Sequence, residues 1–156
     1  MMNANIANGS LQEPECKSAF NPYDELPYKS LPIEWTAPER LAVASLLHGG
    51  PRPPLDTYRV LELGCGDGSN LLPLAYYRRN ATFVGVDGAR SQIEIADSRK
   101  AALGLPNIEF IHADFLTAAK QISGQFNYII AHGVFSWVPK DEIGRASCRE
   151  RVSSPV

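Results

Sequence analysis

Apolar runs and amphipathic stretches alternate along the middle of the chain. Four runs have the length and texture of strands: residues 58–64, 81–87, 107–114 and 125–134. Amphipathic segments with helical spacing follow the first three: residues 69–79, 91–104 and 115–123. This alternation indicates β-α-β crossovers. We therefore predict an α/β fold, a Rossmann-like doubly wound parallel sheet with the strand order 3-2-1-4.

Local signals mark the ends of the longest predicted helix, residues 91–104. Ser91 and Glu94 form a capping-box pattern at its start. Gly104 suits the position just after its last turn, where glycine adopts the left-handed conformation that other residues avoid.

The first 54 residues differ from the alternating region. Residues 1–20 are polar and unpatterned, and we expect a disordered N-terminus. Residues 21–54 should form an extended, proline-rich arm, a helix and a linker. The helix should open at Thr36 or Ala37 with Pro38 in its first turn and end at Gly49. Its apolar face would comprise Leu41, Ala44 and Leu46 or Leu47.

Composition excludes several classes of protein. The 156 residues suit about one domain, and a net charge of −2 gives no case for nucleic-acid or membrane-surface binding. The N-terminus lacks the apolar core of a signal peptide, and no apolar run is long enough to span a membrane. Three scattered cysteines without a C-x-x-C pair favour a reducing compartment, so we expect a cytoplasmic protein. The sequence contains no metal-ligand cluster.

The stretch VLELGCGDGSN joins the first predicted strand to its helix. It holds glycines at alternate positions, Gly64, Gly66 and Gly68, and acids on either side, Glu62 and Asp67. In open α/β sheets, ligands bind beyond the carboxyl ends of the strands. The other strands bring Asp87, Asp114 and His132 to that edge.

The acids argue against a pyrophosphate ligand, since they would repel a dianion. The spacing G-x-G-x-G also differs from the G-x-G-x-x-G of dinucleotide sites. An acid about 20 residues past the turn, here Asp87, can accept hydrogen bonds from both ribose hydroxyls of a nucleoside. A positively charged nucleoside without phosphates fits this pattern, and S-adenosylmethionine is such a molecule.

VLELGCGDG resembles motif I of class I S-adenosylmethionine-dependent methyltransferases, FVGVD their second strand and IHAD their third. The resemblance covers residues 59–139. The segments NPYDELPYKSLPIEWTAPERLA, CGDGSNLLPLA and NYIIAHGVFSWVP further resemble bacterial methyltransferases that carry a C-terminal methyltransferase regulatory domain. Residues 55–141 would then be the S-adenosylmethionine-binding half of a methyltransferase domain, with an unknown small-molecule or protein acceptor.

The resemblance implies a role for each residue around the cofactor. Gly64 and Gly66 would let the methionine moiety approach, Glu62 would face its ammonium, and Asp87 would hold the ribose. The full cofactor set is Glu62, Gly64, Cys65, Gly66, Asp67, Gly68, Asn70, Asp87, Gly88, Asp114, Phe115 and Ala131. Within it, Asp114 would accept from the adenine amino group, Phe115 would pack on the ring and Asn70 would lie near the methionine carboxylate.

Several of these roles have a structural alternative. Asp114 can cap the following helix while Phe115 joins the core, and Asn70 can be a plain surface residue. His132 could be a general base or a structural histidine. Cys65 is a small loop filler rather than a nucleophile. The aromatic residues Tyr23, Tyr28 and Trp35 could form a lid over the cofactor or pack as core.

After Lys140 the apolar pattern of the sequence stops, and arginines occur every few residues. Glu142 to Val152 resembles the translation of a common short-read sequencing adapter, so we expect residues 142–156 to be a non-native tail that packs no core. The chain then looks truncated after the fourth strand and should be inactive by itself. The rival hypothesis is a non-catalytic nucleoside-binding Rossmann-like module or a nicotinamide-dependent enzyme.

Overall fold

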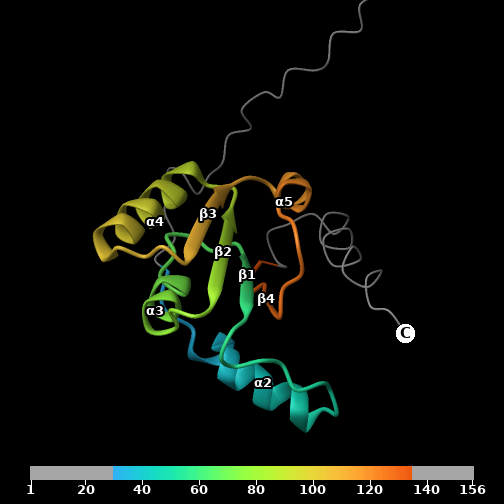
Figure 1. Ribbon diagram of the computed structural model, residues 1–156. Coiled ribbons are helices and arrows are strands. Elements are labelled where there is room, and N and C mark those ends of the chain that lie inside the picture. Colours follow the sequence, from blue (N-terminus) through green and yellow to red (C-terminus); the bar gives the residue numbers. More distant parts are fainter. Residues whose placement is uncertain (1–29, 135–156) are drawn as a thin grey trace, which may run out of the picture.

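The computed structural model describes residues 30–134 (Figure 1). Its strands are β1 (Arg59–Leu63), β2 (Thr82–Asp87), β3 (Ile108–His112) and β4 (Tyr128–Ile130). Its helices are the short 3-10 helix η1 (Glu34–Thr36), α2 (Pro38–Leu47), α3 (Leu71–Tyr77), α4 (Arg90–Leu103) and α5 (Phe115–Gln121). Every strand and helix predicted from the sequence within this range is present.

The strands form one parallel sheet in the order β3-β2-β1-β4, which confirms the α/β Rossmann-like class and the order 3-2-1-4. β1 lies in the interior of the sheet, with Val60 opposite Phe83 of β2 and Tyr128 of β4. The carboxyl ends of β1 and β2 are therefore neighbours, and the loops that follow them meet.

Each face of the sheet packs against different helices because successive side chains of a strand point to opposite sides. α3 and α4 cover one face, and α5 lies over the other (Figure 1). Leu71 of α3 and Val60 of β1 are fully enclosed on the first face. Burial of such a side chain stabilises the fold by about 1.5–3 kcal/mol. On the second face Ala118 of α5 packs with Leu61, Val84 and Val86.

The ends of α4 differ in part from the prediction. Gly104 is left-handed, with φ 58° and ψ 46°, as predicted. The capping box is wrong, because α4 begins at Arg90 and its N-cap is Ala89, which makes no side-chain cap hydrogen bond. The Ala89 amide donates instead to Asp87 Oδ1 at 2.8 Å. This bond turns the chain into the helix before Ser91 is reached.

α2 has Ala37 as its N-cap and Pro38 in its first turn, as predicted, but of its predicted apolar face only Leu41 packs against the core. The buried residues of α2 are Pro38 and Ala42, with Leu41 partly buried against the core. Ala44 is exposed, and Leu47 is 80% exposed. Only the first half of the helix reaches the body of the domain, so the apolar spacing of its second half is not matched by burial.

Several predictions fall outside the described residues. These are the disordered N-terminus at 1–20, the aromatic residues Tyr23 and Tyr28, and the non-native tail at 142–156. Trp35 lies within the described range and is 71% exposed. It is therefore not part of the core, which was one of its two predicted places.

No helix among residues 30–134 combines the length and the apolar character that crossing a membrane requires. The same part of the chain holds no group of three or more His, Cys, Asp or Glu side chains placed to bind a metal ion.

β4 leads to a prediction about association. Within the described residues it pairs only with β1, and Ile129 is 39% exposed on it. Open apolar edges template pairing with other chains. We expect the 156-residue chain, purified alone, to self-associate at micromolar concentration in size exclusion with light scattering. Ile129→Lys should reduce that association, and a wild-type chain that elutes as a monomer would contradict the prediction.

Candidate functional site

The turn between β1 and α3 has a backbone that only glycine adopts readily. Gly64, Gly66 and Gly68 have φ of 73°, 53° and 75°. The amides of Gly64 and Cys65 both donate to the Val86 carbonyl, at 2.8 and 3.0 Å, which fixes the turn to β2. The sequence thus places a rigid, side-chain-poor surface at the carboxyl edge of the sheet.

Asp87 at the end of β2 joins this turn to the start of α4. Its Oδ2 accepts from the Gly66 amide at 2.8 Å, and its Oδ1 accepts from the Ala89 amide at 2.8 Å. An ionised carboxylate has about four acceptor positions, so two remain for a ligand. Asp87 is only partly buried, as a ligand contact at the sheet edge requires.

Glu62 is the buried acid of the site and is only 3% exposed. Its Oε1 accepts from Asn70 Nδ2 at 2.8 Å, whereas its Oε2 is buried without a hydrogen-bond partner. The pKa of Glu62 is raised to about 7, because burial and the charge of Asp87, which raise it, together outweigh the hydrogen bond from Asn70, which lowers it. A buried carboxylate oxygen without a partner is a place for a cationic donor.

Asn70, at the start of α3, connects Glu62 to the segment before α2. It is 7% exposed, so the alternative of a plain surface residue is wrong. Its Nδ2 donates to Glu62 and to Thr36 Oγ1, the latter at 3.0 Å, and its Oδ1 accepts from the Ile33 amide at 2.8 Å. These bonds use both amide hydrogens, so its predicted role near a ligand carboxylate gains no support from the geometry.

Asp67 faces α4 rather than the interior of the turn. Arg99 Nη1 lies 2.8 Å from its Oδ2 and also donates to Ser69 Oγ at 3.1 Å, while the Ser69 amide donates to Asp67 Oδ1 at 3.1 Å. Although burial raises the pKa of Asp67, the hydrogen bonds from Ser69 and Arg99 outweigh it, and the pKa is lowered. Asp67 therefore holds the outer side of the turn.

Arg99 and Gln92, both on α4, are residues that the sequence analysis missed. Gln92 is buried, and its Oε1 has no hydrogen-bond partner. This oxygen lies close to the glycine turn, 3.8 Å from where a Cβ on Gly66 would stand. A usable signal existed, because Gln92 shares the buried helix face with Ala96, four residues on. Arg99 gave no such signal, since it is 32 residues from Asp67 along the chain.

Residues 55–149 match a family model described as a methyltransferase domain. The chain belongs to this methyltransferase family. The match runs past Glu142 into the segment predicted to be non-native, so the origin of that tail stays a prediction.

Individual proteins resemble the chain over most of its length. An uncharacterized protein of Rickettsia prowazekii is 48% identical over 120 residues, which are 77% of this chain and 22% of that protein. The structure of PKMT2 from Rickettsia typhi in complex with AdoHcy has a TM-score of 0.68 at 35% identity, covering 75% of this chain and 23% of that one. This chain spans less than a quarter of either protein.

The fold is also shared with a more distant protein. The SAM-dependent methyltransferase from Geobacter sulfurreducens, in complex with S-adenosyl-L-homocysteine, has a TM-score of 0.50 at 21% identity. The match covers 80% of this chain and 47% of that one.

Cys65 of the methyltransferase domain is buried, and its side chain packs on β2. A Cβ on Gly85 would lie 2.8 Å from its Sγ, so the glycine makes room for it. Burial raises the pKa of the thiol well above its ordinary value, and the charges of Asp87 and Glu62 raise it further. A neutral, buried thiol is a poor nucleophile, in agreement with the predicted filling role.

Asp114 is the N-cap of α5, the structural alternative considered for it. Its Oδ1 accepts from the Thr117 amide at 2.8 Å and its Oδ2 from the Thr117 hydroxyl at 2.6 Å. These bonds lower the pKa of Asp114. Phe115 is partly buried and packs with the core beneath α5. An additional role for either residue at an adenine ring stays a prediction.

Asp114→Ala separates the two roles. As a lost N-cap, the change should lower the free energy of unfolding of the methyltransferase domain by about 1 kcal/mol. Denaturant unfolding measures this, with the exposed acid Asp97→Ala on α4 as the matched control. Unchanged stability together with a tenfold loss of cofactor affinity would contradict the capping role and favour contact with adenine.

The remaining predicted residues lie beyond the strand ends. Gly88 follows β2, and its carbonyl lies 3.2 Å from His112 Nε2. Ala131 and His132 follow β4, and His132 is exposed. Val134 reaches back toward the glycine turn, where its Cγ2 stands 2.7 Å from the position of a Cβ on Gly64. Absence of that Cβ lets the segment after β4 close onto the turn.

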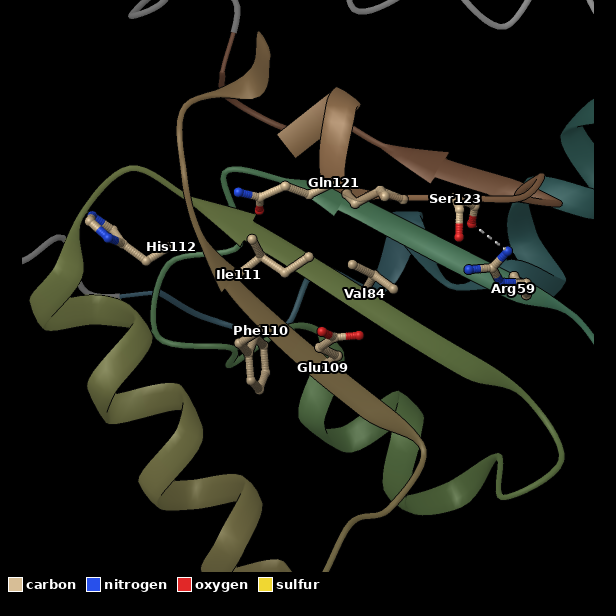
Figure 2. A pocket seen from close by; sticks show the side chains of 9 residues that line it. Arg59, Val84, Glu109, Phe110, Ile111, His112, Gln121 and Ser123 are labelled. Carbon is tan, nitrogen blue, oxygen red and sulfur yellow. Dashed lines mark hydrogen bonds between the residues drawn. The ribbon is translucent and has the colours of Figure 1, made fainter. Parts of the chain in front are cut away.

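A hollow of about 450 Å³ lies elsewhere, over β2 and β3 on the face that α5 covers (Figure 2). Arg59, Glu109 and Gln121 are among its lining residues, and none of the glycine-turn residues is. The Arg59 guanidinium is already bonded to the Ser123 and Gln125 carbonyls at 3.1 and 3.3 Å. We therefore place the candidate site at the glycine turn and not in this hollow.

Proposed function

We propose that the chain carries the S-adenosylmethionine site of a class I methyltransferase. Asp87 would accept from the ribose hydroxyls, and Glu62 Oε2 would accept from the ammonium of the methionine moiety. Gly64, Gly66 and Gly68 leave room for that moiety to lie against the backbone. The observation that carries the proposal is the buried, unpartnered Oε2 of Glu62 beside a glycine turn.

The electrostatics favour this cofactor over a nicotinamide dinucleotide. Two carboxylates, Glu62 and Asp87, face the turn, and a pyrophosphate there would be repelled. Among the described residues, the Arg99 guanidinium is bonded at the turn, but it already pairs with Asp67 on the outer side. A cationic ligand would instead be attracted, and it would supply the hydrogen-bond donor that Glu62 lacks.

When bound, S-adenosylmethionine supplies a methyl group already activated by its sulfonium. The residues of this chain then have to orient the cofactor and exclude water. The acceptor is an unidentified small molecule or protein, and we expect neither nucleic acid nor membrane as partner. His132 after β4 is our candidate general base toward that acceptor. We expect the protein to act in the bacterial cytoplasm.

The proposal for the whole protein extends beyond the chain described here. The chain spans less than a quarter of its Rickettsia relatives. We infer that a complete protein adds the acceptor side and the regulatory domain suggested by the sequence resemblance. The 156-residue chain would then bind the cofactor weakly and transfer no methyl group.

Calorimetric titration of the whole protein with S-adenosylhomocysteine and with NAD⁺ tests the proposal. We expect a one-to-one complex with S-adenosylhomocysteine and no measurable heat with NAD⁺. The reverse preference would establish the nicotinamide alternative. Binding of both ligands with equal affinity would favour a nucleoside-binding module without methyl transfer.

A further inference from the structure

Residues 30–36, the segment before α2 that we call the arm from here on, touch the site at two places. A Cβ on Gly66 would stand 2.5 Å from Ser30 Oγ, so the arm packs directly on the glycine turn. The Ile33 amide and the Thr36 hydroxyl, further along, both bond to Asn70. The arm therefore contacts the turn at one end and the partner of Glu62 at the other.

The orientation of the Asn70 amide is dictated by its partners. Ionised Glu62 can only accept, so it requires Nδ2, and the Ile33 amide can only donate, so it requires Oδ1. Thr36 Oγ1 accepts the second Nδ2 hydrogen and donates to the Ile33 carbonyl at 2.9 Å. Turning the amide over would break the bonds on both sides at once. Arm and carboxylate are thus joined by one side chain with one satisfactory orientation.

We propose that Asn70 is a positioning residue that couples docking of the arm to recognition of the cofactor ammonium by Glu62. The inference rests on the proposed function. With the arm docked, Asn70 donates to Oε1 and holds Glu62 so that its unpartnered Oε2 is presented to the ligand. When the arm lifts, Asn70 loses its hold, and Glu62 is free to leave the orientation that the ligand needs.

Coupling of this kind works in both directions. If docking of the arm raises the affinity for the cofactor by some factor, cofactor binding must favour docking by the same factor. The Ile33 amide is a direct reporter, because its hydrogen is protected by Asn70 only while the arm is docked. A ligand without the ammonium should leave this reporter unchanged.

Amide hydrogen exchange of Ile33, followed by NMR in the whole protein, tests the inference. S-adenosylhomocysteine should slow the exchange roughly 10- to 100-fold, the worth of a hydrogen bond to a charged group. 5′-Methylthioadenosine, which lacks the amino-acid part, should not slow it. Asn70→Ala should abolish the ligand-dependent slowing and weaken S-adenosylhomocysteine binding by a similar factor.

Two further variants keep the test decisive. Thr36→Val removes only the hydroxyl that holds Asn70 from the arm, and it should reduce the effect if Asn70→Ala does not fold. Glu34→Gln, the matched control, changes an exposed side chain of the arm that pairs with Arg40 of α2, and it should behave as the wild type. Tight binding of S-adenosylhomocysteine without slower Ile33 exchange would overturn the inference alone. Absence of binding to the wild type would overturn the proposed function as well.

Discussion

Asp87→Ala is expected to weaken S-adenosylhomocysteine binding about 100- to 10,000-fold. The ligand would lose two charge-assisted hydrogen bonds, each worth about 1.5–3 kcal/mol. The structure adds a second reason, because the Gly66 and Ala89 amides lose their acceptor and the glycine turn loses its link to α4. Isothermal titration of the whole protein measures the effect.

Two control variants separate the causes of the Asp87 effect. Asp97→Ala removes an exposed acid from α4 and should leave the affinity unchanged. Asp87→Asn keeps one acceptor oxygen and should lose less affinity than alanine. If Asp87→Ala binds S-adenosylhomocysteine as tightly as the wild type, the ribose assignment is wrong.

Relative to the wild type, Glu62→Gln should stabilise the ligand-free protein at high pH, and this stabilisation should disappear at low pH. The folded-state pKa of Glu62 is raised from 4.5 to about 7. Below pH 4.5 the carboxyl is protonated in both states. Between these values the unfolded chain ionises while the folded chain keeps its proton, so wild-type stability falls as the pH rises. Above pH 7 the full penalty is reached, roughly 3 kcal/mol.

Denaturant unfolding at pH 4.5 and pH 8 tests the Glu62 prediction. The stability of Glu62→Gln minus that of the wild type should grow by roughly 3 kcal/mol between the two pH values. Any fixed cost of burying the new amide cancels in this comparison. Glu94→Gln, at an exposed position on α4, is the control and should show no growth. The same difference at both pH values would mean that Glu62 is not held in a costly charged state.

Much of the fold was predictable because its signals are local. Each strand is a short apolar run, each helix has its own periodicity, and Gly104 ends α4 as its conformational freedom requires. The order of the strands is the one expected for half of a doubly wound sheet of the Rossmann type. The face of α2 was not predictable, since which of its apolar residues are buried depends on where the rest of the domain lies.

The site was predictable in outline and not in its connections. The glycine turn, Glu62 and Asp87 can be recognised in the sequence by their spacing and by their place at strand ends. Arg99 on Asp67, and Asn70 between the arm and Glu62, are contacts over 32 and 34 residues of chain that folding alone creates. Asp114 was ambiguous in the sequence for a different reason. It lies both at the end of a strand and at the start of a helix, so its position alone does not separate a ligand contact from a helix cap.

Recognition of the cofactor ammonium by Glu62 Oε2 can be tested directly. The most direct measurement compares the affinities of S-adenosylhomocysteine and 5′-methylthioadenosine for the wild type and for Glu62→Gln at pH 8. We expect the wild type to prefer S-adenosylhomocysteine, and the variant to lose about 10- to 100-fold of this preference while binding 5′-methylthioadenosine as before. An unchanged preference in Glu62→Gln would mean that Glu62 does not bind the ammonium.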